Sequence, residues 1–262
     1  KVKAFFVEEP RRGIPADLTN EGIRGLKHEK STFFPAQIGQ GCTWDKDLIR
    51  EIGRITGEEA RALGYTNVYS QILDVARDPR WGRTVESYGE DPYLVGELGR
   101  QQVLGIQSNR VVSTPKHFAI YGVPAGGRDC ESRTDPHATP QEVHELHLEP
   151  FRIAFQEAGA LGTMCAHNDY NGTPVSASHY LMTELMRNQW GFKGYIVSDS
   201  WSISKNVDFY HIVSTPEEAV ASELNAGLNI RTFFEESEVF IETLRNALKK
   251  GLVTESTLDQ RV

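Results

Sequence analysis

Short apolar runs alternate with amphipathic stretches along the whole of this chain. Six of the runs are rich in β-branched residues and nearly continuous in apolar content, which is typical of strands covered on both faces. These runs are Ile14–Thr19, Asn67–Val75, Val111–Phe118, Leu161–His167, Gly194–Ser198 and Gly227–Arg231. Because strand and helix patterns take turns, the sequence predicts parallel strands joined by right-handed crossovers.

The stretches between the runs carry helix signals. Lys46–Leu63 places its apolar residues on roughly one face. Thr139 and Thr215 are each followed by Pro and, three residues on, by Glu, which predicts an N-cap and a capping box at both positions. Further helices are expected from Asp91, over Ser178–Trp190, and over about Ser237–Lys250, the last ending at Gly251.

Two α/β folds fit this alternation, a doubly wound sheet and a (β/α)₈ barrel. No Gly-x-Gly-x-x-Gly follows any of the runs, and the glycines of the Pro124–Asp129 stretch have the wrong spacing, which weakens a dinucleotide-binding fold. The chain has no internal repeat and no linker rich in Gly, Ser or Pro. We therefore expect one domain over residues 1–262.

Composition excludes several classes of function. There is no run of 18 apolar residues, so we expect no membrane span, and the net charge of −8 argues against a nucleic-acid binder. Cys42, Cys130 and Cys165 are too few for a disulfide framework. His144 and His147 are spaced i, i+3, not the i, i+4 of zinc proteases, so a helix surface is the better interpretation. We predict neither metal nor cofactor.

Polar side chains follow the apolar runs, at the ends that parallel strands bring to one face of a barrel. They include Glu21, Arg83, Lys116, His117, His167 and Asp199. Solvent at strand ends explains part of this pattern, but not a Lys-His pair inside an apolar run, because buried charge is costly unless it is paired or used. Carboxylates and cations of this kind bind sugar hydroxyls, and Trp44, Trp81 and Trp201 are candidates for stacking on sugar rings.

Four motifs carry a family resemblance. They are Arg77–Arg83 with Glu86 and Gly89–Pro92, Lys116–Phe118, Met164–Gly172, and Trp190–Asp199. In this order they resemble the catalytic N-terminal domain of glycoside hydrolase family 3, the β-glucosidase-like enzymes, from about Gly13 to Val262. The resemblance implies a TIM-type (β/α)₈ barrel, incomplete here because only about six strand–helix units of eight are readable.

The resemblance also implies a role for each motif residue. Asp199 matches the catalytic nucleophile of a retaining mechanism. Lys116, His117 and Arg83 match groups that bind the sugar in the −1 subsite. Glu21 matches a carboxylate that binds hydroxyls far from the anomeric carbon.

Two positions depart from the family pattern near the expected nucleophile. His167 stands where the family usually has Tyr, and its charge would vary near neutral pH while it still donates a hydrogen bond. Ser200 stands where an aromatic residue commonly follows the nucleophile, with Trp201 one place later. We count His167 among the sugar-binding candidates.

The general acid/base has no clear candidate. In most of the family it comes from a C-terminal domain, which we expect to be absent here, together with the first segment of the barrel. A subgroup uses an Asp–His pair on a loop, but the spacing around Asp135 and His137 matches it badly, and a loop with a helix start is the better interpretation. We expect this chain alone to bind sugar weakly and to hydrolyse poorly.

The expected function is a β-glycosidase domain, acting on β-glucosides, with the carbohydrate substrate and the C-terminal domain as its partners. The alternative is a truncated or degenerate carbohydrate-binding domain without turnover, and the intact set Asp199, Lys116, His117 and Arg83 favours the enzyme. β-Xylosides, N-acetylglucosaminides and arabinosides stay open as substrates. The compartment also stays open, with a periplasmic or secreted location as an implication of the resemblance.

Overall fold

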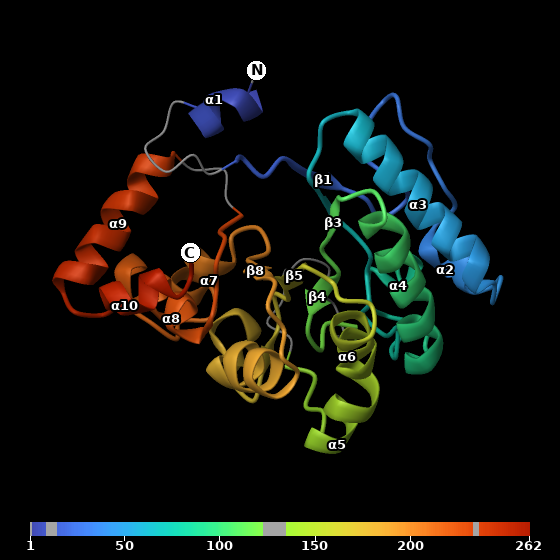
Figure 1. Cartoon of the computed structure of the whole chain (residues 1–262). Helices are drawn as coiled ribbons and strands as arrows, with labels where there is room; N and C mark the ends of the chain where they lie inside the picture. Colours follow the sequence, from blue (N-terminus) through green and yellow to red (C-terminus); the bar gives the residue numbers. More distant parts are fainter. Residues whose placement is uncertain (1, 9–14, 123–134, 233–235) are drawn as a thin grey trace.

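A computed structural model describes residues 2–8, 15–122, 135–232 and 236–262 (Figure 1). Ile14, Pro124–Asp129 and Cys130, discussed above, lie outside the described residues. The strands are β1 (Thr19–Glu21), β2 (Asn67–Tyr69), β3 (Val112–Ser113), β4 (Lys116–Phe118), β5 (Gly162–Cys165), β6 (Asp169–Tyr170), β7 (Thr173–Pro174) and β8 (Tyr195–Val197).

Helices lie between most of the parallel strands in chain order. They are α1 (Val2–Glu8), α2 (Gln37–Gly41), α3 (Lys46–Ala62), α4 (Pro92–Gln107), α5 (Pro140–Glu142), α6 (Glu149–Gln156), α7 (Ser202–Asp208), α8 (Pro216–Ala226), α9 (Ser237–Lys249) and α10 (Glu255–Asp259). Two 3₁₀ turns, η1 (Thr84–Glu86) and η3 (Val175–Ala177), and two π-type helices, η2 (Val143–His147) and η4 (Tyr180–Gln189), complete the set. No helix in the described part of the chain is long and apolar enough to cross a membrane.

Two parallel sheets have strand orders β1–β2–β3 and β4–β5–β8. A bridge between Ile72 and Lys116 joins the first sheet to the second, and a bridge between Val197 and Ile230 extends the second. Neighbouring strands therefore follow one another in chain order, as in a (β/α)₈ barrel and unlike the reversal of a doubly wound sheet. Within the described residues the pairing uses all six predicted strand positions and stops at β1 and Ile230.

The strands are shorter than the apolar runs, for reasons visible in their hydrogen bonds. The run from Val111 splits into β3 and β4 at Pro115, which has no N–H for the ladder. The run beginning at Gly227 is reduced to one bridge, because the side chain of Asn229 accepts the Ile196 N–H at 2.9 Å in place of a backbone carbonyl. The first strand lies at Thr19–Glu21, beyond Pro15, so Glu21 ends β1 and does not follow it.

The predicted helices form where their start signals stand. Asp45 caps α3 and Asp91 caps α4, and complete capping boxes at Thr139 and Thr215 begin α5 and α8. The prediction of a helix surface is wrong for His147, which is buried in η2. Burial and the charge of Arg77 lower the pKa of His147 to about 4, so this histidine is neutral at physiological pH.

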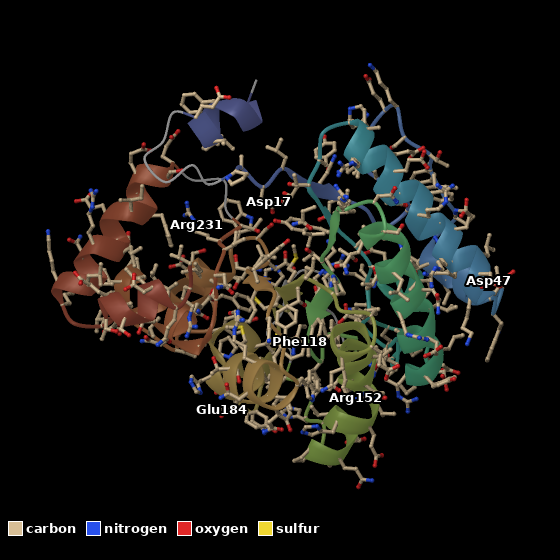
Figure 2. The ribbon with its side chains drawn as sticks, in the orientation of Figure 1. Asp17, Asp47, Phe118, Arg152, Glu184 and Arg231 are labelled. Carbon is tan, nitrogen blue, oxygen red and sulfur yellow. The ribbon has the colours of Figure 1, made fainter. Side chains whose placement is uncertain are left out.

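The core lies between the strands and helices α4 and α6. Phe118 of β4 is fully buried and packs edge-on against Phe151 of α6, with ring centroids 5.3 Å apart. Figure 2 shows Phe118 near the centre of the molecule, with Asp47, Arg152 and Glu184 at its periphery. The strand that carries Lys116 and His117 is thus held from behind by aromatic packing.

Candidate active site

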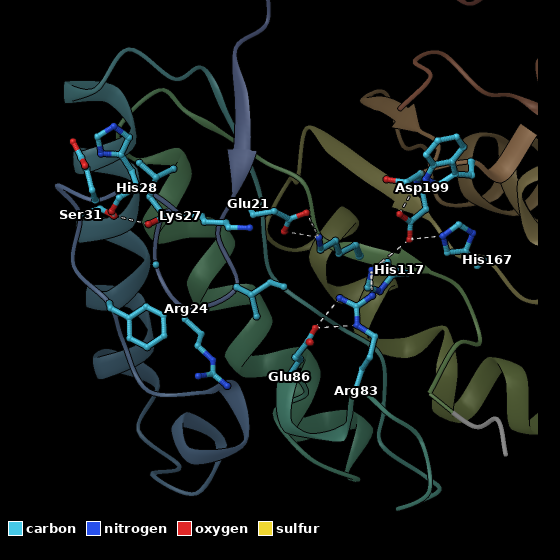
Figure 3. Close-up of a pocket in the computed structure, with 18 of the residues that line it drawn as sticks. Glu21, Arg24, Lys27, His28, Ser31, Arg83, Glu86, His117, His167 and Asp199 are labelled. Atoms are coloured by element: carbon cyan, nitrogen blue, oxygen red, sulfur yellow. Dashed lines mark hydrogen bonds and ion pairs between the residues drawn. The ribbon is translucent and has the colours of Figure 1, made fainter. Parts of the chain in front are cut away.

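A cavity of about 970 Å³ opens at the carboxyl ends of the parallel strands (Figure 3). Five different strand positions supply its polar lining, since the side chains come from the end of β1, the loop after β2, β4, and the turns after β5 and β8. All six site residues predicted from the sequence line it, namely Glu21, Arg83, Lys116, His117, His167 and Asp199. The carboxyl ends of barrel strands are where such folds place their active sites.

Asp199 follows β8 and is held on both carboxylate oxygens. Oδ1 accepts a hydrogen bond from the Ser200 N–H at 2.7 Å. Oδ2 lies 3.3 Å from Nε2 of His167 and 3.7 Å from Nε2 of His117. The side chain is 14% exposed, so a small ligand in the cavity can reach this carboxylate.

Lys116 is nearly fully buried in β4 and forms an ion pair with Glu21. Its ammonium group donates to both carboxylate oxygens of Glu21, at 2.9 and 2.7 Å. The Tyr69 ring lies 5.9 Å away and covers the ammonium from another side. A charge buried to this degree needs such a partner, and Glu21 keeps it neutralised while leaving its own side chain 39% exposed.

Arg83 connects Glu86 to His117. Its Nε and Nη2 donate to the same oxygen of Glu86 at 2.9 and 2.7 Å, and its Nη1 lies 2.9 Å from Nε2 of His117. Burial lowers the pKa of His117 well below its usual value, and the charges of Arg83 and Lys116 lower it further. His117 is therefore a neutral ring, and its Nε2 accepts the hydrogen bond from Arg83.

Asp74, which no sequence motif indicated, lies directly behind His117. Its Oδ2 accepts the His117 N–H at 3.0 Å and lies 2.8 Å from the ring nitrogen Nδ1. Burial raises the pKa of Asp74 to about 7, although the His117 hydrogen bond and the cations Arg83 and Lys116 act against the rise. An aspartate inside the apolar run Asn67–Val75 was the available signal, because an unpaired charge there would be costly.

One of the three tryptophans proposed to stack on sugar rings lies at the cavity. Trp201 lines the cavity and is 46% exposed. Trp81 is buried, packs edge-on against Tyr121 and does not line the cavity. Trp44 lies between α2 and α3, exposed and also outside the lining, so neither it nor Trp81 is placed to stack on a sugar in this cavity.

The segment between β1 and α2 forms the other wall of the cavity, and no motif pointed to it. Figure 3 shows Arg24, Lys27, His28 and Ser31 along this wall, opposite Asp199. Phe33 also lines it, with the Arg24 guanidinium 5.6 Å from its ring. Loop side chains of this kind follow no periodicity, so a sequence pattern could not place them.

Asp135 and His137 lie in a loop before α5, as expected, and do not line the cavity. Asp135 accepts hydrogen bonds from the N–H groups of His137 and Gly172, at 2.9 and 3.2 Å. The His137 side chain is 88% exposed. These are local contacts of a loop, as the sequence predicts.

The charges divide the lining into a reactive group and neutralised groups. Among the described lining carboxylates, Glu21 is bound to Lys116 and Glu86 to Arg83, and Glu29 is exposed on the outer segment. Asp199 is the carboxylate bracketed by two histidine rings. Chemically, the arrangement offers one nucleophile beside several hydrogen-bonding groups that suit a polyhydroxylated ligand.

The sequence of this chain matches a known protein family and its members. The family model described as the glycosyl hydrolase family 3 N terminal domain matches residues 2–262. A putative beta-xylosidase of Formosa agariphila is 33% identical over 270 residues, covering 100% of this chain and 35% of that protein. Beta-glucosidase B of Emericella nidulans is 31% identical over 260 residues, covering 96% of this chain and 28% of that protein.

Solved structures agree with the family model. A β-glucosidase from Erythrobacter marinus superposes with a TM-score of 0.91 at 32% identity, covering 99% of this chain and 35% of that one. A beta-glucosidase from Listeria innocua superposes with a TM-score of 0.88 at 28% identity, with the same coverage of both chains. These matches confirm the predicted TIM-type α/β fold. The chain spans about a third of the length of the relatives it matches.

Proposed function

We propose that this chain, which belongs to glycosyl hydrolase family 3, is the catalytic barrel domain of a retaining β-glycosidase, with Asp199 as its nucleophile. The observation that carries the proposal is the convergence of Asp199 with Lys116, His117 and Arg83 in one cavity. A carbohydrate-binding domain without turnover would gain little from a carboxylate held on both oxygens and reachable from that cavity.

The chemistry follows from the positions of the groups. The Asp199 carboxylate attacks the anomeric carbon, the bond to the leaving oxygen breaks as that oxygen takes a proton from the general acid, and a glycosyl ester forms on Asp199. Lys116, Glu21 and Arg83 bind the hydroxyls of the same sugar and orient it for attack. Water then hydrolyses the ester and restores the carboxylate.

A terminal β-D-glucoside or β-D-xyloside is the proposed substrate. Named relatives include beta-glucosidases and beta-xylosidases, and the two sugars differ only at the carbon-5 substituent, so we propose both as substrates. The acid/base is proposed to come from a further domain of the same protein. The support is that the lining carboxylates of the described residues other than Asp199 are ion-paired or on the outer wall.

Trapping the ester tests the proposal. A 2-deoxy-2-fluoro-β-glucosyl fluoride, and its xylosyl counterpart, carry a leaving group that departs without acid help, so they label the nucleophile even when the acid is lacking. We expect a glycosyl ester on the peptide that contains Asp199, and none in Asp199→Asn. Asp208→Asn, an exposed carboxylate at the end of α7, is the matched control and should label like the wild type. A label on another carboxylate, or binding without any label, would favour the alternative of a non-catalytic domain.

A further inference from the structure

Asp74 is a buried carboxylate that the proposed chemistry does not use. It does not line the cavity, and its side chain has no exposed surface. Among the described residues, both hydrogen-bonding contacts of its side chain go from one oxygen, Oδ2, to one residue, His117. Its other oxygen has no hydrogen-bond partner among the described residues. Burying such a carboxylate costs free energy, which suggests that Asp74 acts on the cavity residue His117 beside it.

The tautomer of His117 can be read from the two ends of its ring. Arg83 has only donors, so the Nη1 that lies 2.9 Å from Nε2 requires a lone pair on Nε2. In a neutral ring the proton then sits on Nδ1, which lies 2.8 Å from Asp74 Oδ2. The Arg83 contact thus shows which tautomer is present, and Asp74 Oδ2 is placed to accept the proton on Nδ1. The ring plane is also fixed, because Tyr121 packs edge-on against it at 5.1 Å.

This tautomer matters for the neighbouring carboxylate. His117 Nε2 lies 3.7 Å from Oδ2 of Asp199. A proton on that nitrogen would point toward the carboxylate oxygen and would oppose the Arg83 donor. A lone pair there keeps Arg83 in place and leaves Asp199 with His167 as its nearby ring donor.

We propose that Asp74 is a positioning residue that fixes the Nδ1–H tautomer of His117, so that this ring holds Arg83 and does not donate to Asp199. Its catalytic consequence rests on the proposed function, whereas the tautomer itself does not. The role resembles that of the carboxylates behind metal-bound histidines, where loss of the partner typically costs 10- to 100-fold. We expect a loss of roughly this order in kcat/KM for Asp74→Ala.

Nitrogen NMR of the histidine rings tests the tautomer without any turnover. The chain has eight histidines, and the signals of His117 are those that disappear in His117→Gln. We expect Nδ1 of His117 at the shift of a protonated ring nitrogen and Nε2 at that of an unprotonated one. The opposite pattern in the wild-type protein would overturn the proposal, and so would an Asp74→Ala protein that keeps the wild-type pattern.

Two further variants separate positioning from packing. Asp74→Asn keeps the volume, and the His117 backbone N–H orients its amide oxygen toward Nδ1, so it should keep the tautomer and restore most of the activity lost in Asp74→Ala. In a double-mutant cycle, Asp74→Ala should cost little on top of His117→Ala, because it acts through that ring. Fully additive losses, or an Asn variant as impaired as the Ala variant while its tautomer is intact, would contradict the proposal. If no variant turns over, the NMR pattern still decides the tautomer, and the trapping experiment decides the proposed function.

Discussion

His167 is the nearer of the two histidine rings beside the proposed nucleophile, with Nε2 3.3 Å from Asp199 Oδ2, against 3.7 Å for His117. Its side chain is 4% exposed, and its backbone carbonyl accepts a hydrogen bond from the Tyr210 hydroxyl. The residue is therefore held from behind, and the turn after β5 presents its ring to the carboxylate. We infer that His167 donates a hydrogen bond to Asp199 from the position where the family pattern has a tyrosine.

Removing that donor should slow the enzyme. A hydrogen bond to a charged group contributes about 1.5–3 kcal/mol, so His167→Leu should lower kcat/KM by roughly 10- to 100-fold. His167→Gln, whose amide N–H can donate, should retain more activity than the Leu variant. Initial-rate kinetics on an activated aryl β-glucoside checks both. His179→Leu removes an exposed histidine from η4's N-terminus and is the matched control, expected to be unchanged. Equal activity of the Leu and wild-type proteins would show that this contact carries no catalytic weight.

The six lining residues were predictable because each is a polar residue at the end of an apolar run or within a specific motif. Asp74 was not, because its role depends on the side chain of His117, which lies across a strand pairing and 43 residues away in sequence. Trp81 was misplaced for a similar reason, since only the fold shows that Tyr121 covers it. Sequence patterns thus identify the residues that face a ligand more readily than the residues that hold those side chains in position.

Glu223 ties together the elements that frame the proposed nucleophile. It lies in α8, is fully buried, and its Oε1 accepts hydrogen bonds from Ser176 of η3 and from Ser202 and Asn206 of α7, at 2.8, 3.0 and 2.9 Å. Helix α7 begins three residues after Asp199. Burial raises the pKa of Glu223 to about 7 despite these three donors. The Glu223 carboxyl thus holds α7 against η3, but its ionised form lowers the stability of the fold.

Because ionising the buried Glu223 is unfavourable, we predict that the stability of the fold depends on pH. The folded-state pKa is raised above the usual 4.5, so the stabilisation is complete below about pH 4.5 and is lost as the pH rises through about 7. A displacement of this size corresponds to roughly 3 kcal/mol of unfolding free energy. Glu223→Gln keeps an oxygen for the three donors, so it should remove this part of the decline and be more stable than the wild type at pH 8.

Urea unfolding at pH 5 and pH 8 measures the difference. The raised pKa of Asp74 acts in the same direction, so some decline should remain in the variant. Glu242→Gln, on the exposed face of α9, is the matched control and should keep the wild-type difference between the two pH values. An unchanged pH dependence in Glu223→Gln would rule out this carboxyl as its source.

Helices were easier to predict than strands because the residues that start or end a helix lie within a few positions of each other in the sequence. The Thr-Pro-x-Glu starts at Thr139 and Thr215 became capping boxes, since the donor and acceptor of each lie three residues apart. A strand end depends instead on a partner elsewhere in the chain. Asn229 shows this, because its side chain takes a ladder hydrogen bond from Ile196, 33 residues earlier, and limits the last strand position to one bridge.

At the scale of the whole molecule, the groups proposed for the first step of the reaction lie together. The proposed nucleophile and the proposed hydroxyl-binding side chains converge on one side of the cavity, whereas the lining carboxylates of the described residues outside Asp199 are paired or on the outer wall. A retaining glycosidase needs its second carboxyl roughly 5–5.5 Å from the first. If that group belongs to another domain, the requirement for it should depend on the leaving group.

The dependence on leaving group is the sharpest test of this division. A dinitrophenolate leaves without protonation, so the 262-residue chain should form the Asp199 ester from a 2,4-dinitrophenyl β-glucoside and release a burst of the phenol. Cleavage of phenyl β-glucoside needs the acid, whose contribution to the rate is typically 10²- to 10⁴-fold. This chain should therefore cleave phenyl β-glucoside slower than the dinitrophenyl glucoside by about that factor.

A longer protein that includes the proposed further domain should narrow the rate difference between the two glucosides, because the proposed acid of that domain would protonate the poorer leaving group and then activate water for the second step. Asp199→Asn should abolish the burst in both proteins. Rapid cleavage of phenyl β-glucoside by the 262-residue chain would place the acid among its own residues. Tight sugar binding with no burst from the dinitrophenyl glucoside would instead support a domain that binds carbohydrate and does not cleave it.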